Sequence, residues 1–149
     1  MSPLPGLLLA GAVLGGSSPP CEELPITITR VSHCILLKAE IGGRAATLIL
    51  DTGASNTILS SELLGPASTP LQVKPLKGSG LVGTGRWRRA TIRIGRTVWV
   101  DHRVLEMDGL QDVSRGLKES VDGILGEDLL ADFRIVIINY LDRTVTLAR

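Results

Sequence analysis

Residues 48–60, LILDTGASNTILS, place one carboxylate, that of Asp51, directly after an apolar run. An aspartate at the end of a buried strand costs free energy unless it is hydrogen-bonded, paired or used in chemistry. A Thr-Gly pair and a run of small residues follow at once, and this is also the composition of an ordinary turn. Asp51 is therefore either a turn-forming residue or one half of a catalytic site.

Short apolar segments punctuated by glycine surround this stretch. Residues 26–43, 44–51, 86–107 and 134–149 alternate or run apolar between turns, which predicts strands. Aromatic residues make up only 3% of the chain, so aliphatic side chains must fill the core. We predict an all-β barrel with one short helix. The helix is expected directly after the segment Ile124-Leu125-Gly126, and the polar stretch at 108–123 is expected to be turn-rich.

Length and charge restrict the number of domains and the class of partner. A chain of 149 residues suffices for one hydrophobic core but not for two lobes. The formal net charge is +1, and the only dense basic patch, RWRR at 86–89, is interpreted as a solvated strand face. Without a basic balance or a known module, no nucleic-acid partner is expected. His33 and His102 stand apart from other metal ligands, so no metal or cofactor is expected.

Residues 1–24 are interpreted as a leader that precedes a domain at 25–149. An apolar stretch at 7–14 followed by small residues and prolines is typical of a secretory signal peptide. It is too short to span a bilayer, so no stable membrane span is expected in the mature chain. We expect export, with an uncleaved flexible leader as the alternative because the segment has no Lys or Arg. Cys21 and Cys34 either pair, if the protein is exported, or remain free thiols.

A glycine-dense stretch contains the pattern G-x-G-x-x-G at Gly78, Gly80 and Gly83. A dinucleotide site needs this pattern between a strand and a helix, whereas a strand pattern follows here. We therefore interpret the stretch as a hairpin that is able to fold over a bound ligand, or as an ordinary flexible turn.

Two motifs together resemble a known family. Asp51-Thr52-Gly53 is a weak signal alone, but it follows an apolar run, and the later segment DGILG, residues 122–126, adds two apolar residues and a glycine. In this combination the chain, from about Ile26 onward, resembles the retropepsin-like aspartic proteases. These are the single-domain relatives of pepsin found in retroviruses and as bacterial and plant cellular proteins. The resemblance implies a closed acid-protease barrel with a glycine-rich flap.

The resemblance also assigns roles to individual residues. The catalytic loop would consist of Asp51, Thr52 and Gly53, and the segment Ile124, Leu125 and Gly126 would support it from below. Substrate would contact Ala54 and a flap containing Gly78, Ser79 and Gly80, which lie 27–29 residues after Asp51.

The implied chemistry needs two carboxylates that share one proton and face one water molecule. The ionised carboxylate takes a proton from the water, while the protonated one polarises the scissile carbonyl. Neither of the other Asp-Gly pairs, Asp108-Gly109 and Asp122-Gly123, combines an apolar strand before it with a hydroxyl residue between Asp and Gly. We therefore expect a homodimer with Asp51 from each chain. By resemblance, the C-terminal strand TVTLAR would pair across this dimer.

The chain departs from the family pattern at two positions. Ala54 stands where pepsin-like enzymes often carry Ser and retroviral ones carry Ala, so one hydrogen bond to the charged carboxylate is lost relative to the pepsin-like enzymes. We expect a mildly acidic to near-neutral pH optimum as a result. Glu127 stands where retroviral members usually carry Arg, so the resemblance does not extend to their dimer contacts around the following helix, although it still implies the pair of Asp51 residues.

The leading hypothesis is an aspartic endopeptidase that acts on extended polypeptide. The first alternative is a binding or dimerisation module of the same fold with little or no proteolytic activity. The second alternative is an unrelated small β-barrel in which Asp51 only caps a turn.

Overall fold

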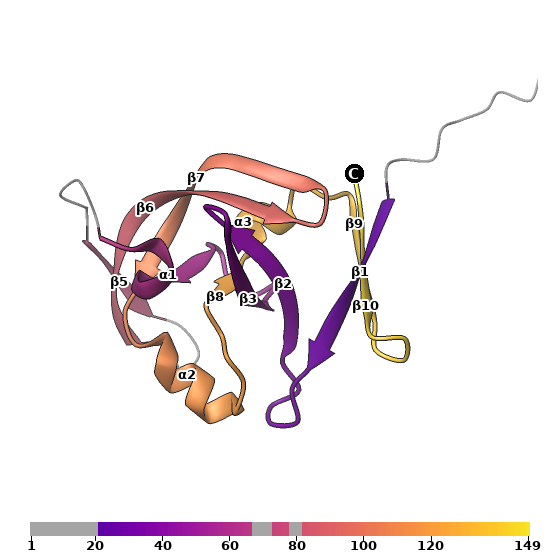
Figure 1. The fold of residues 1–149 in the computed structure, drawn as a ribbon, viewed down its shortest axis with the longest axis horizontal. Coiled ribbons are helices and arrows are strands. Elements are labelled where there is room, and N and C mark those ends of the chain that lie inside the picture. The colour runs from indigo at the N-terminus through magenta and orange to yellow at the C-terminus, as the bar shows by residue number, and fades with distance from the viewer. Residues whose placement is uncertain (1–20, 67–72, 78–81) are drawn as a thin grey trace, which may run out of the picture.

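A closed barrel of six strands forms the body of the chain (Figure 1). The computed structural model describes residues 21–66, 73–77 and 82–149. In spatial order the barrel strands are β2 (Ile35–Ile41), β3 (Arg44–Leu50), β8 (Gly123–Leu125), β4 (Ile58–Ser60), β7 (Thr97–Met107) and β6 (Val82–Ile94). The pairing of Ile41 with Ile92 between β2 and β6 closes the barrel. The sheet is mixed, because β3–β8 and β4–β7 are parallel. The predicted all-β, closed acid-protease barrel is confirmed.

Four further strands pair with the barrel from outside, one beside β6 and three beside β2. β5 (Val73–Lys77) pairs antiparallel with β6. On the other side, β1 (Cys21–Ile28), β10 (Thr144–Ala148) and β9 (Ile135–Asn139) lie side by side, as the right of Figure 1 shows. β10 lies between β1 and β9 and pairs with both. The expectation that the C-terminal strand pairs across a dimer is therefore wrong, because both of its edges are occupied within the chain.

Three short helices lie among the described residues: α1 (Ser61–Leu64), α2 (Leu110–Leu117) and α3 (Glu127–Leu130). α3 is the helix predicted after Gly126, whereas α1 and α2 are not predicted from the sequence. α2 replaces most of the expected turn-rich stretch. Its apolar residues Leu110, Val113 and Leu117 follow helical spacing, so one face packs on the barrel while the polar residues remain outside.

Two clusters of aliphatic side chains fill much of the structure. The larger one lies within the barrel and includes Leu37, Leu48, Leu59, Val104, Leu125 and Leu129. The smaller one, which we call the second cluster, consists of Ile58, Leu105, Met107, Leu110 and Ile124, with Ala54 and Trp87 packed against it. α2 thus stabilises the second cluster through Leu110, beside the segment that carries Asp51.

The boundary of the predicted leader differs from the structure. Cys21–Leu24, which the sequence-based boundary assigns to the leader, lie in β1 and pair with β10. Residues 1–20 lie outside the described part of the chain, so the assignment as an export signal stays a prediction. No helix among the described residues has the length and apolar character that crossing a membrane requires.

The two cysteines lie at opposite ends of β1. Cys21 pairs with Ala148 at the start of the strand, whereas the carbonyl of Cys34 accepts a hydrogen bond from the N–H of Thr29 just beyond its end. Eight residues of extended chain span about 26 Å, and a disulfide needs Cα atoms within about 7 Å. Cys21 and Cys34 therefore do not pair within one chain, and both are free thiols here.

β8 passes between β3 and β4. Its first residue, Gly123, lies so close to both strands that only glycine fits there. A Cβ atom on Gly123 would lie 2.5 Å from the carbonyl oxygen of Ile58 and 2.8 Å from side-chain carbons of Leu48 and Leu59. The backbone of Ile58 cannot retreat without opening the β4–β8 pairing. Gly123 is thus a steric requirement of the barrel.

We expect Gly123→Ala to destabilise the protein by about 2–3 kcal/mol, since it overpacks a closed interior. Gly116, in α2, has no atom within 4 Å of the position that an alanine methyl group would take, and it serves as the matched control. Gly116→Ala should stabilise by about 0.5–1 kcal/mol, because alanine favours the helix. Urea unfolding of both variants tests this contrast, and equal midpoints would contradict it.

Candidate active site

Asp51 lies at the point where β3 leaves the barrel. Its N–H donates to the carbonyl of Leu125 at 3.1 Å, one residue beyond the parallel register Leu50–Leu125. The backbone of Asp51 is therefore held by the same strand pairing that holds the core. Because the strand ends here, the chain emerges from the interior, and Asp51, Thr52 and Gly53 are all exposed.

The carboxylate of Asp51 is oriented by its own loop. The N–H of Gly53 donates to Oδ1 of Asp51 at 2.8 Å, and the N–H of Ala54 donates to the carbonyl of Asp51 at 3.2 Å. A Cβ atom on Gly53 would lie 3.2 Å from that same Oδ1, so a larger residue would crowd the carboxylate. The loop thereby holds one carboxylate oxygen by a hydrogen bond and leaves the other available for chemistry.

Gly126 packs directly beneath the loop. A Cβ atom on Gly126 would lie 2.5 Å from the carbonyl carbon of Asn56 and 2.8 Å from the carbonyl oxygen of Ala54. The next N–H, that of Glu127, donates to the carbonyl of Ala54 at 2.7 Å. The structure thus brings together the Asp-Thr-Gly loop and the Ile124-Leu125-Gly126 segment, which are far apart in the sequence.

The residues predicted to contact substrate are described only in part. Ala54 is half-buried and packs at the edge of the second cluster, which contains Ile58 and Ile124. Gly78, Ser79 and Gly80 lie outside the described residues. The strands that lead to them, β5 and β6, are paired up to Lys77 and Val82. The assignment of these glycines to a flap stays a prediction.

The aspartates of the other Asp-Gly pairs have structural partners. Asp122 accepts the N–H of Thr47 on Oδ2 at 2.8 Å, and its own N–H donates to the carbonyl of Thr47 at 2.8 Å. Asp108 faces Arg86 at 3.2 Å. In the described part of the chain, no group of three or more His, Cys, Asp or Glu side chains is arranged to hold a metal ion.

A polar chain, meaning a series of hydrogen-bonded groups, lies behind the Asp51 loop. It is not predicted from the sequence. Thr57 Oγ1 accepts the N–H of Gly126 at 3.2 Å and donates to Oδ1 of Asp128 at 2.7 Å. Oδ2 of Asp128 lies 3.1 Å from Nε2 of His102. The expectation that His102 stands alone is thus wrong. No sequence spacing could have indicated this contact, because His102 and Asp128 come from β7 and α3.

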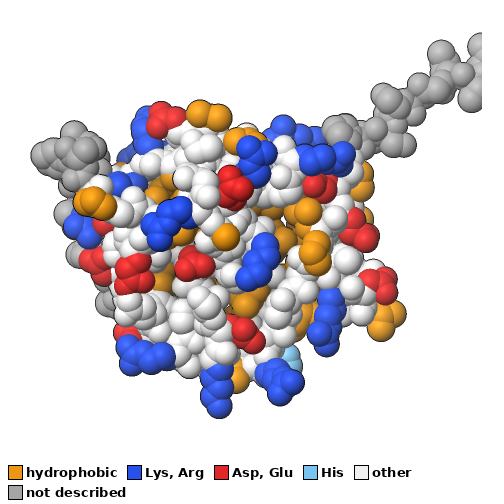
Figure 2. Space-filling model, in the orientation of Figure 1, with side chains coloured by type: hydrophobic (Ala, Val, Ile, Leu, Met, Phe, Trp, Pro, Cys, Tyr) orange, Lys and Arg blue, Asp and Glu red, His pale blue; other side chains and the backbone are white. Residues whose placement is uncertain are grey.

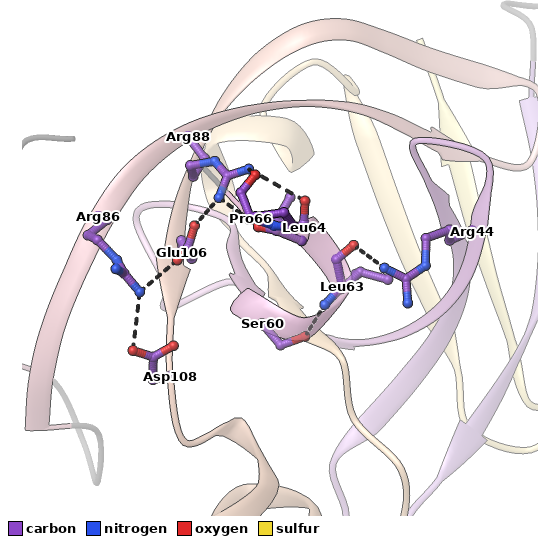
Figure 3. Close-up of polar contacts among 10 residues, drawn as sticks. Arg44, Ser60, Leu63, Leu64, Pro66, Arg86, Arg88, Glu106 and Asp108 are labelled. Atoms are coloured by element: carbon purple, nitrogen blue, oxygen red, sulfur yellow. Dashed lines mark hydrogen bonds and ion pairs between the residues drawn. The ribbon is translucent and has the colours of Figure 1, made fainter. Parts of the chain in front are cut away.

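A buried carboxylate, that of Glu106, holds the base of the β5–β6 hairpin to the barrel (Figure 3). Its side chain is only 4% exposed and receives Arg86 at 2.8 Å and also Arg88. Arg88 donates in addition to the carbonyl of Gly65 at 3.1 Å, at the end of α1. Arg44 donates to the carbonyl of Leu63 at 2.7 Å, within this helix. Two arginines therefore satisfy carbonyls that the short helix leaves open at its end.

The basic patch RWRR is only in part the solvated face that the sequence suggested, because Arg88 is largely buried whereas Arg86 and Arg89 are substantially exposed. Arg86 and Arg88 turn toward Glu106, while Trp87 packs against the second cluster and under the guanidinium of Arg103 at 3.9 Å. Arg89 is paired with Asp101 at the surface. On the face shown in Figure 2, basic and acidic side chains are interspersed. The arginines of the patch therefore stabilise the fold by pairing with carboxylates of the neighbouring strand β7.

Comparison with known proteins identifies the family. The family model described as aspartyl protease matches residues 37–129, from β2 to α3. The chain belongs to the aspartyl protease family. The matched region includes both the Asp51 loop and the Gly126 segment that packs beneath it. No curated protein matches the chain.

A solved structure supports the same fold for this aspartyl protease family member. The chain is similar to a retropepsin-like aspartic protease from Rickettsia conorii, with a TM-score of 0.58 and 20% sequence identity. The match covers 87% of this chain and 93% of that one. The likeness therefore extends beyond the matched family region and includes most of the described barrel.

We expect Glu106→Ala to destabilise the protein by about 3 kcal/mol, because it leaves Arg88 without its buried partner. Asp108 contacts the same Arg86 but is 71% exposed, so Asp108→Ala should change the stability by less than about 1 kcal/mol. Thermal and urea unfolding of the two variants measure the difference. Similar losses in both would show that burial of Glu106 does not decide its contribution.

Proposed function

We propose that the chain is an aspartic endopeptidase that hydrolyses peptide bonds with a water molecule activated by two copies of Asp51. The observation that carries the proposal is the geometry of the Asp51 loop. Within an aspartyl protease family member, an exposed carboxylate is oriented by the N–H of Gly53 and backed by Gly126. An aspartate that only caps a turn needs no such support from a segment distant in sequence.

The reaction needs two carboxylates, and the Asp51 loop offers one. When two carboxylates face each other closely, one proton is shared between them. The ionised carboxylate removes a proton from water, which attacks the scissile carbonyl, and the protonated carboxylate polarises the carbonyl oxygen. The amine then leaves as the proton is returned to its nitrogen. A second chain related by a twofold axis would supply the second Asp51.

The substrate we propose is an extended polypeptide. A strand-like peptide would lie between the Asp51 loop and the predicted flap, with main-chain hydrogen bonds for affinity and side-chain pockets for selectivity. Ala54, which is half-buried against the aliphatic second cluster, would favour an apolar side chain next to the scissile bond.

The open edge of β9 supports the proposed dimer. β9 ends the strand order of the described sheet, and its side chains Ile135 and Ile137 are 52% and 54% exposed. The turn after it exposes Tyr140 and Leu141 as well. An apolar edge strand is prone to pair with other chains unless something covers it. Two copies of β9 related by a twofold axis would pair antiparallel, which places this edge rather than β10 in the interface.

Asp51→Asn tests the catalytic role. It retains the size and the bond from Gly53 but removes the charge, so we expect peptide hydrolysis to fall by about 10²–10⁴-fold or more. The assay uses casein and a peptide library, with and without a pepstatin-type inhibitor. Asp112→Asn, at an exposed position of α2, is the matched control and should retain full activity.

The assay separates the proposal from its alternatives. Hydrolysis that survives Asp51→Asn would exclude the aspartate pair. An unmodified chain that is dimeric but cleaves nothing would favour the binding or dimerisation module instead.

We expect Ile137→Lys to convert the dimer into monomers, because a charged residue on an edge strand opposes pairing. Light scattering should give twice the chain mass of 15.8 kDa for the unmodified protein and close to that mass for the variant. Val31→Lys, at a partly exposed valine in the β1–β2 turn, is the control. A variant that stays dimeric and active would move the interface away from β9.

A further inference from the structure

The polar chain behind the Asp51 loop has a defined direction. Thr57 is fully buried, and its hydroxyl has one proton and must also accept the N–H of Gly126. Its proton therefore points to Oδ1 of Asp128, 2.7 Å away. An ionised carboxylate only accepts hydrogen bonds, so Nε2 of His102 must carry the proton shared with Oδ2 of Asp128. Both side chains thus donate to Asp128.

This series of hydrogen bonds connects the outer wall of the barrel to the segment that supports the Asp51 loop. His102 belongs to β7, Asp128 lies in the first turn of α3, and Thr57 follows the loop directly before β4. Gly126, the last member, has its backbone in close contact with Ala54 and Asn56. A displacement of Gly126 toward the loop cannot be absorbed locally, because these contacts already leave no room for a further atom.

We propose that His102 is a positioning residue for the Asp51 loop, acting through Asp128 and Thr57. The proposal rests on the proposed function, because positioning of the loop affects a rate only if Asp51 performs chemistry. Oδ1 of Asp128 accepts the N–H of Leu129 at 3.1 Å as well as the Thr57 hydroxyl, whereas Oδ2 is held by His102. His102 therefore sets the remaining orientation of the carboxylate plane and with it the direction in which Oδ1 faces Thr57. The Thr57 hydroxyl in turn accepts the N–H of Gly126. This bond fixes the position of Gly126 and therefore the distance of the Asp51 loop from α3.

The position of His102 separates this role from simple stabilisation. Its side chain is 25% exposed and that of Asp128 is 17% exposed, so water is able to replace the imidazole at modest cost in stability. Water would leave Oδ2 without a fixed partner, however, so that only the contacts of Oδ1 with Thr57 and with the N–H of Leu129 would still orient the carboxylate. Loss of the imidazole should therefore affect the alignment of the loop more than the global stability of the barrel.

The test compares His102→Leu with His102→Gln. Leucine removes the donor, whereas the amide nitrogen of glutamine is able to reach the place of Nε2 and donate to Asp128. We expect His102→Leu to lower kcat about tenfold per folded dimer with KM changed less than about twofold, since misalignment of reacting groups acts on the chemical step. His102→Gln should recover most of the rate. Arg103→Leu, at the next residue of β7 and so on its opposite face, is the control and should leave kcat unchanged.

A measurement that does not need activity accompanies the kinetics. Amide hydrogen exchange followed by NMR reports the bond from Gly126 to Thr57 directly, and the amide of Val145 in β10 is the reference. His102→Leu should accelerate exchange at Gly126 about tenfold with Val145 unchanged, and His102→Gln should restore protection. An inactive chain with this exchange pattern would overturn the proposed function and retain the link from His102 to the loop.

Three results would overturn the positioning role. The first is unchanged exchange at Gly126 in His102→Leu. The second is equal acceleration at Gly126 and Val145, which would mean a loss of global stability only. The third comes from a double-mutant cycle with Thr57→Val. If His102 acts through Thr57, adding His102→Leu to Thr57→Val should lower kcat little further. If the two reductions in kcat multiply instead, the two residues have independent roles.

Discussion

The structure depends on the close passage of the segment Gly123–Gly126 between β3 and β4. Its first glycine touches the backbone of Ile58, and its last glycine touches the backbone of Asn56 and Ala54. Between them, Leu125 holds the N–H of Asp51. A barrel closed in this way has no freedom to shift one strand, because a protein interior packs at crystal-like density. The position of the carboxylate is therefore a consequence of how the core closes, rather than of the loop alone.

Much of this arrangement could be predicted from local sequence. An apolar run that ends in Asp51, and two apolar residues followed by Gly126, are patterns that a buried strand and a close backbone contact require. The remainder depends on pairings that local patterns do not contain. Arg86 and Arg88 look solvated until β7 brings Glu106 opposite them. Residues 134–149 are predicted as a hairpin, but the outer side of β10 looks free until β1 pairs with it. α2 is the exception, since the helical spacing of its apolar residues is visible in the sequence but is outweighed by the polar residues between them.

Two surface features of the chain support the homodimer that we propose. The carboxylate of Asp51 lies exposed on a strongly supported loop, and the described sheet ends in an apolar strand at β9. The exposed apolar area of β9 costs free energy in an isolated chain. In the proposed homodimer a second copy of β9 would cover this area, and Asp51 would face a second carboxylate.

In the homodimer that we propose, the site is divided between two chains, which places an unusual demand on each loop. When both carboxylates lie in one chain, a single scaffold sets their separation, but across a twofold axis any error in one loop appears twice. The support must then be rigid on the side away from the axis, where only the chain's own residues are available. Behind the Asp51 loop of this chain lie Gly126, Thr57 and Asp128, with His102 at the outer end. A chain of hydrogen bonds suits this role because each of these bonds has its donor and acceptor assigned, so that no second arrangement of equal energy exists.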